Sequence, residues 1–264
     1  MNSQTHSSSQ NIYSILSQTQ RLRVSDGVIK PVLYDCAHTS KLLVLIWSQL
    51  GDFDTLEYAW WLQREKAQIA ARGITIRAIA IGNRNSGIKF CEYTGFPQEW
   101  LFIDAKAEIH KLLKLYPGLN IQLPLLSTSQ TAWLNLMLMC AGIGSPGTLK
   151  EVFRGYRGDK KAPQLIADEE VVKDIPLPPI KGSFFQAVGK KGCQRPFELA
   201  TLRLRNMTEV LSNWKTYVPD SSYLTQRGAT FLFDAQGKLI YQHCDRAILG
   251  FAENMSNPLS FLYD

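Results

Sequence analysis

Residues 42–47 read Leu-Leu-Val-Leu-Ile-Trp, an uninterrupted apolar run that decides the fold. Such a run is typical of a central strand in a parallel sheet whose two faces are both covered by helices. A helix is predicted to follow, capped by Asp54 or Thr55 and ending at Arg72 and Gly73. Residues 74–82, rich in β-branched side chains, predict the next strand. These segments make a β-α-β unit, which we expect to be right-handed.

The α/β alternation continues along the chain after this unit. Further elements are predicted as helices over residues 88–93 and 108–115, strands over 100–103, 229–233 and 238–243, and a closing helical turn over 257–263. The two last strands are separated by a short connection that contains Gly237, which indicates a β-hairpin. The whole pattern predicts an α/β fold.

The N-terminal residues give a weaker signal. Residues 1–25 are mostly polar and lack apolar periodicity, so we expect a flexible arm there. Residues 28–34 predict a short strand, and Pro31 within it favours the edge of the sheet.

The alternation breaks between residues 120 and 227. This part is rich in proline, with one predicted helix over residues 197–214, and we expect it to form an insertion or an elaborated lobe. Residues 132–143 form its most apolar stretch, which is too short to cross a bilayer. The stretch predicts a buried core helix, with a helix that docks on a membrane or a partner as the alternative.

The composition is that of an ordinary packed protein, with 45% apolar and 20% charged residues. The net charge of +6 is concentrated in residues 144–227, which carry 14 basic and nine acidic residues. No dense basic run stands out, so nucleic-acid binding is not expected. The five cysteines have no metal-site spacing and no secretory signal is visible, which favours a reducing cytoplasm.

Several short segments carry a resemblance to a known family. They are Gly51 with Glu57 and Ala59, and the stretches 91–97, 155–159 and 228–239. In this order they resemble the AhpC/TSA peroxiredoxin-like proteins of the thioredoxin superfamily. The resemblance implies one thioredoxin-like domain over residues 26–264, with a mixed sheet flanked by helices. It also implies a long insertion, about 167–225, before the C-terminal hairpin, and its details look like a branch from photosynthetic bacteria.

That family carries a Gly-Cys-x-x-Cys motif in the loop after the first central strand. The resemblance places Asp52 and Thr55 of this chain at the two cysteine positions. Peroxide reduction needs a thiolate that can pass through a sulfenic acid, and a carboxylate offers no such cycle. The family's antioxidant, redox activity is therefore not expected from these two positions.

Asp52 supports two interpretations. It can cap the helix that follows, since a negative group is favourable beside the free N–H groups of a helix N-terminus. Alternatively, Asp52, Asp54 and Glu57 can form an acidic pocket that binds a hard cation or acts as an acid and base.

Among the cysteines, Cys193 is the most plausible reactive thiol, because Lys190, Lys191 and Arg195 flank it and nearby cations favour the thiolate. Cys91 lies in a short predicted helix, where an inert buried thiol is the ordinary outcome.

Two functions follow. The first is a pseudoenzyme, a binding or assembly module that engages a protein partner and associates with a large complex or the periphery of a membrane, with no cofactor. The alternative is a thiol-dependent peroxidase or oxidoreductase that uses a relocated cysteine, with Cys193 as the first candidate.

Overall fold

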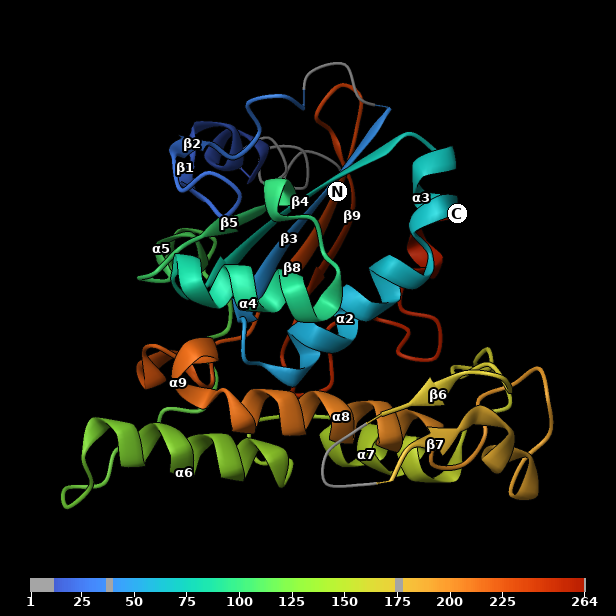
Figure 1. The fold of residues 1–264 in the computed structure, drawn as a ribbon. Helices are drawn as coiled ribbons and strands as arrows, with labels where there is room; N and C mark the ends of the chain where they lie inside the picture. Colours follow the sequence, from blue (N-terminus) through green and yellow to red (C-terminus); the bar gives the residue numbers. More distant parts are fainter. Residues whose placement is uncertain (1–11, 37–39, 174–177, 264) are drawn as a thin grey trace, which may run out of the picture.

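The core of the protein is a seven-stranded mixed sheet in the order β2-β1-β5-β4-β3-β8-β9 (Figure 1). The computed structural model describes residues 12–36, 40–173 and 178–263. The strands are β1 (Gln20–Arg23), β2 (Ile29–Pro31), β3 (Lys41–Gln49), β4 (Ile74–Ile81), β5 (Leu101–Ile103), β8 (Ala229–Asp234) and β9 (Leu239–Cys244). Strands β3, β4 and β5 are parallel, whereas β1 and β8 join them antiparallel. This arrangement is consistent with the predicted thioredoxin-like fold.

Strand β3 is buried on both faces, as its apolar run predicts. Leu43, Leu45 and Trp47 point into one core, with residues of α2 (Phe53–Arg64) and α4 (Arg84–Thr94). Leu42, Val44 and Ile46 point into the other core, under a helical stretch at residues 12–18 and α5 (Glu108–Leu112). Successive side chains of a strand alternate between faces, so one apolar run supplies both cores.

The helix predicted between Asp54 and Gly73 is divided in two. Helix α2 ends at Arg64, and α3 (Lys66–Ala71) follows after Glu65, whose backbone leaves the helical region at φ −103° and ψ 10°. The predicted stop is confirmed, since Gly73 adopts a φ of +63° directly after the second helix.

The prediction of a flexible arm over residues 1–25 is wrong for its second half. Strand β1 lies between β2 and β5, and Leu16 is fully buried in the second core. Strand β1, with the sequence Gln-Arg-Leu-Arg, is only partly buried. Its residues therefore lack the apolar pattern that predicts a strand. Residues 1–11 lie outside the described part. The predicted edge strand at Pro31 is confirmed as β2.

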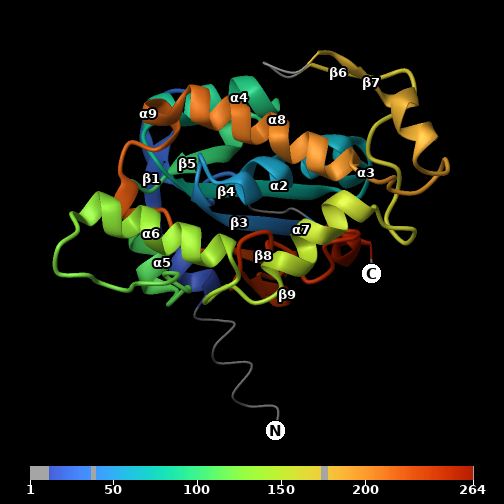
Figure 2. The same ribbon diagram turned by 90° about the horizontal axis from the view of Figure 1, so that it is seen from below.

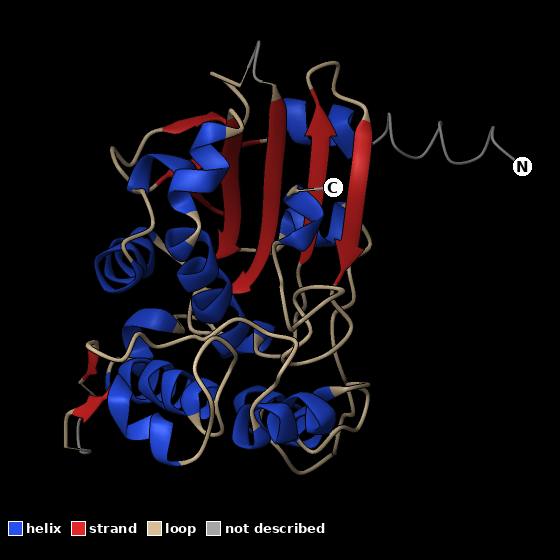
Figure 3. Ribbon diagram, turned by 90° about the vertical axis from the view of Figure 1, so that its right-hand side faces the viewer, coloured by secondary structure: helices blue, strands red, loops and turns tan. Residues whose placement is uncertain are grey.

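The segment between α5 and β8 forms a helical lobe at one end of the sheet (Figures 1 and 3). Its elements are α6 (Thr128–Cys140), α7 (Thr148–Arg157), β6 (Val171–Val172), β7 (Ile180–Lys181), α8 (Glu198–Ser212) and α9 (Trp214–Tyr217). Short 3-10 helices complete the chain at Gln98–Trp100, Gly182–Ala187, Ser221–Tyr223 and Ser260–Leu262. Seen from below, α8 lies on one side of the lobe and α6 with α7 on the other (Figure 2).

The prediction of a buried core helix over residues 132–143 is wrong, because few side chains of α6 are buried. Only Asn135 and Met139 are buried in it, whereas Met137 is 61% exposed and Ile143 is 50% exposed. Apolar residues occur on all sides of this helix, and their high number led to the prediction of burial. In the structure only a narrow stripe of the helix is buried against the rest of the protein. None of the helices in the described ranges has the length and apolarity needed to cross a bilayer.

The aromatic cluster under α4 gives a test of the core. Phe90 is fully buried, with ring centroids 5.4 Å from Trp47 and 6.4 Å from Phe96. We expect Phe90→Ala to lower the free energy of unfolding by about 3–5 kcal/mol, because it leaves a cavity in the core. The matched control Phe184→Ala, at a 65% exposed position, should cost less than about 1 kcal/mol. Urea denaturation of both variants measures the difference, and equal losses would contradict this description of the core.

Candidate functional site

Asp52 caps helix α2, as the first interpretation predicts, whereas the predicted cap at Asp54 or Thr55 is wrong because both residues lie inside the first turn. Its backbone is extended, and its carboxylate accepts a hydrogen bond from the Asp54 amide at 3.0 Å. The same carboxylate accepts a hydrogen bond from the Ser48 hydroxyl at 2.8 Å. Ser48 Oγ also lies 3.1 Å from the hydroxyl of Thr55, which is buried. Ser48, at the end of β3, thus connects the two positions that the resemblance assigns to cysteines.

Arg227 neutralises the acidic first turn of α2. Its Nη2 atom donates to Asp52 Oδ2 at 2.5 Å, and its Nη1 atom lies 3.5 Å from Asp54 Oδ2. The guanidinium is almost fully buried and also donates to the Thr225 carbonyl at 3.0 Å. A buried arginine requires such partners, since an unpaired charge in the interior is strongly destabilising.

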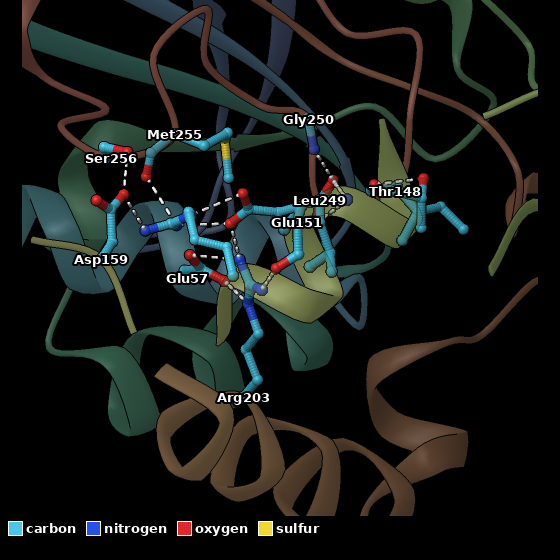
Figure 4. Close-up of polar contacts among 12 residues, drawn as sticks. Glu57, Thr148, Glu151, Asp159, Arg203, Leu249, Gly250, Met255 and Ser256 are labelled. Atoms are coloured by element: carbon cyan, nitrogen blue, oxygen red, sulfur yellow. Dashed lines mark hydrogen bonds and ion pairs between the residues drawn. The ribbon is translucent and has the colours of Figure 1, made fainter. Parts of the chain in front are cut away.

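Asp54 attaches the C-terminal segment to this helix. Its carboxylate oxygens accept the Leu249 amide at 2.8 and 2.9 Å, and the Gly250 amide lies at 3.4 Å (Figure 4). Leu249 has a φ of +58°, a left-handed conformation that is unfavourable for leucine. Burial, together with the charge of Asp52, raises the pKa of Asp54 well above its ordinary value.

A third buried carboxyl, Asp245, faces the same arginine. Burial raises its pKa to about 7, against the opposing charge of Arg227. Its Oδ1 atom has no hydrogen-bond partner among the described residues, and His243 Nε2 lies 3.6 Å away. Three acids therefore surround one arginine, and protonation of an acid relieves the excess negative charge.

Glu57 belongs to a separate ion-pair network. Arg203 of α8 donates to Glu57 Oε2 at 2.7 Å and to Glu151 Oε1 of α7 at 2.7 Å (Figure 4). Arg154 also binds Glu151, at 2.8 Å from its Nε atom. This network connects α2 to two helices of the lobe, so the lobe is fixed over the beginning of α2.

These two networks argue against the acidic pocket formed by Asp52, Asp54 and Glu57. The first two carboxylates turn to Arg227 and the third to Arg203, so the three do not converge. Within the described ranges, no group of three or more His, Cys, Asp and Glu side chains is arranged to hold a metal ion. Asp54 and Glu57, three positions apart, are neighbours along the helix, but each carboxylate is held by a different arginine.

An apolar cavity of about 240 Å³ opens beside the first turn of α2. Residues from α2, three lobe helices and the C-terminal segment line it, among them Phe53, Cys140, Val152, Tyr156, Met207 and Leu249. Cys140 gave no signal in the sequence, yet the charge of Asp52 acts on its thiol. Burial of its sulfur and the charge of Asp52 raise its pKa.

The two cysteines that the sequence singled out lie in other places. Cys91 is buried in α4, and burial raises its pKa to about 12, which disfavours the reactive thiolate. Cys193 is partly exposed in the lobe, with its Sγ 3.7 Å from the Lys190 carbonyl. Two of its three expected cationic neighbours form ion pairs with another residue, because Lys191 and Arg195 each bind Asp168 at 2.7 Å.

Arg203 provides a test of the ion-pair network between α2 and the lobe. We expect Arg203→Met to lower the free energy of unfolding by about 3–5 kcal/mol, since it leaves Glu57 buried without its arginine and removes one of the two arginines that bind Glu151. The control Arg157→Met, at the exposed end of α7, should cost less than about 1 kcal/mol. Urea denaturation measures both variants. If the free energy of unfolding falls no further in Arg203→Met than in the control, the ion-pair network contributes nothing to stability.

The raised pKa of Asp245 predicts a pH dependence of stability. Below pH 3.8 the group is protonated in both states, and between 3.8 and about 7 only the folded state retains the proton. Its contribution to stability is therefore lost as the pH rises through about 7. We expect Asp245→Asn to avoid this loss, so its advantage over the natural chain should grow by about 1 kcal/mol or more between pH 4 and pH 8.

Urea denaturation of both proteins across that pH range measures this advantage. The exposed Glu253→Gln provides the control and should follow the natural profile. A constant difference between Asp245→Asn and the natural chain at all pH values would exclude titration of this group.

Comparison with known proteins identifies the family. The model of the AhpC/TSA antioxidant enzyme family matches residues 61–172 and 179–247. The match includes most of residues 167–225, which the resemblance treats as an insertion, and it begins after Asp52 and Thr55. No curated protein matches the chain. With most of its length covered by the family model, the chain belongs to the AhpC/TSA antioxidant enzyme family, a group of peroxiredoxin-like thioredoxin-fold proteins.

Proposed function

We propose that this chain is a peroxiredoxin-like binding or assembly module without thiol peroxidase activity. The observation that carries this proposal is the carboxylate of Asp52 at the start of α2, ion-paired with the buried Arg227. The resemblance assigns the two family cysteines to Asp52 and Thr55, and the proposal rests on that assignment.

The electrostatic surroundings of Asp52 are those that a reactive thiol would need. Amides at a helix N-terminus and an adjacent cation both stabilise an anion, which is how a thiolate becomes accessible near neutral pH. Here the Asp54 amide and the Arg227 guanidinium stabilise a carboxylate instead. A carboxylate cannot donate two electrons to a peroxide and become a sulfenic acid, so the anion site supports structure without the redox reaction.

The lobe adds a second line of support. Arg203 binds Glu57 and Glu151, and this network holds α7 and α8 against α2. The lobe presents exposed apolar side chains on α6 and in the loop before it. A scaffold that has a carboxylate instead of a thiolate at its anion site, and an apolar outer surface, is suited to binding a protein complex or a membrane surface. The protein partner remains a prediction, as do the cytoplasmic location and the association with photosynthetic bacteria.

The alternative, a thiol-dependent peroxidase or oxidoreductase, is favoured by family membership and by two accessible thiols. Cys193 is partly exposed, and Cys140 lines the apolar cavity beside the first turn of α2. Either sulfur would have to act as a relocated nucleophile.

Peroxide consumption separates the two functions. We expect the purified protein, supplied with hydrogen peroxide and dithiothreitol or a thioredoxin system, to turn over no faster than a boiled sample. Turnover that disappears in Cys193→Ser or Cys140→Ser, and persists in the buried control Cys91→Ser, would overturn the proposal and identify the relocated thiol. Mass spectrometry of alkylated and sulfenylated cysteines reports the same outcome directly.

A further inference from the structure

The sequence around α6 contains an unusually long segment without charge. None of residues 115–149 is Lys, Arg, Asp, Glu or His. The segment lies largely at the surface, since Leu125 is 95% exposed and Ile121, Leu123 and Leu126 are also exposed. A contiguous exposed apolar patch without charge marks a contact with a partner or a membrane, so this segment is suited to a less polar environment than water.

The apolar loop before α6 is held in a defined position. The Asn135 side chain of α6 binds both backbone groups of Ile121: its Oδ1 accepts the amide at 3.0 Å and its Nδ2 donates to the carbonyl at 3.0 Å. Ser127 caps α6 in a capping box with Gln130. The exposed leucines are therefore presented on an ordered element, which reduces the entropy lost on docking.

A cavity of about 820 Å³ lies between this loop and the end of α5. Lys111 and Lys114 line one part of it, and Leu119, Leu123 and Leu126 line another. Ammonium groups next to an apolar wall match an amphipathic anion, with a phosphate beside the lysines and an acyl chain along the leucines.

The nearby carboxylates do not cancel these lysines. Glu108 of α5 binds Arg21 at 2.9 Å. Asp220, next to the Ser221–Tyr223 turn that packs on α6, accepts hydrogen bonds from the Ser222 amide and hydroxyl. On the other side, the uncharged segment ends at the exposed Lys150. The charge that borders the segment is therefore mainly positive.

We propose that the loop over residues 119–126, with Lys111 and Lys114 beside it, docks this protein on the surface of an anionic lipid bilayer. The leucines enter the boundary between headgroups and acyl chains, while the lysines remain at the level of the lipid phosphates. The proposal rests on the proposed function, because it specifies what the binding module binds.

Vesicle co-sedimentation tests this docking. We expect the full chain to bind vesicles of phosphatidylcholine with phosphatidylglycerol and to bind pure phosphatidylcholine far more weakly. Binding should fall steeply at about 1 M salt, where the Debye length is about 3 Å. No binding to the anionic vesicles at low salt overturns the proposal, and so does equal binding to both compositions.

Two surface variants locate the contact. We expect Leu125→Asp, and the double variant Lys111→Glu with Lys114→Glu, each to weaken binding at least about tenfold, since one lysine near an anionic membrane contributes about 1 kcal/mol. Ile29→Asp, at an exposed position of β2, should bind as the natural chain does. Thermal melting checks that all variants are folded. Unchanged binding by both Leu125→Asp and the double lysine variant overturns the proposal.

Other occupants of this surface give different results. Sedimentation velocity that shows a dimer lost in Leu125→Asp, without vesicle binding, would assign the loop to a second copy of the chain. Capture of a protein through the same loop, again without vesicle binding, would assign it to a protein partner. Either result overturns membrane docking but leaves the binding-module function intact, whereas peroxide turnover contradicts that function independently of the vesicle result.

Discussion

The buried ion pair between Arg227 and Asp52 is the constraint on which the site depends. Arg227 precedes β8 and Asp52 follows β3, so their contact fixes the loops at the ends of two adjacent strands. Asp54 lies 3.5 Å from the same arginine, and the charge of Asp245 acts on it too, so one cation offsets the charge of several carboxyls. In a low-dielectric interior such a cluster is stable only as a whole, because loss of the cation would leave several uncompensated acids.

The lobe depends on a second arginine in a comparable way. Arg203 of α8 joins Glu57 of α2 to Glu151 of α7, and Arg154 extends this network to the Met255 carbonyl near the C-terminus. Elements far apart in the chain therefore meet at the first turns of α2 (Figure 4). In this family member the place beside the helix N-terminus is a junction between the sheet, the lobe and the C-terminal segment.

Much of the fold could be predicted from local patterns. The apolar run in β3, the β-branched run in β4 and the hairpin β8–β9 give strong local signals, and the structure confirms each. The cap at Asp52 could also be predicted, since capping is a local interaction. Strand β1 could not, because a partly buried strand of four residues carries too little hydrophobic contrast.

The partners of the acidic residues lay beyond the reach of sequence spacing. Arg227 is separated from Asp52 by 175 positions, and Arg203 from Glu57 by 146, so no local motif connects them. The same limit applies to Cys140, which reaches the cavity near Asp52 only through the packing of α6. The exposure of α6 could not be predicted for a different reason. A high apolar content ordinarily indicates burial, but the actual burial of a helix depends on which elements pack against it.

The position of β1 has a consequence for how much of the chain the sheet requires. Its pairing covers the outer edge of β5, whose three residues Leu101, Phe102 and Ile103 are all buried, and it provides the attachment for β2. A shortened protein that began at residue 26 would leave the backbone N–H and C=O groups at this edge of β5 unpaired and open to the strands of other molecules, a recognised route to aggregation. Strand β1, which lies in a polar part of the sequence, thus protects the sheet against pairing with strands of other molecules.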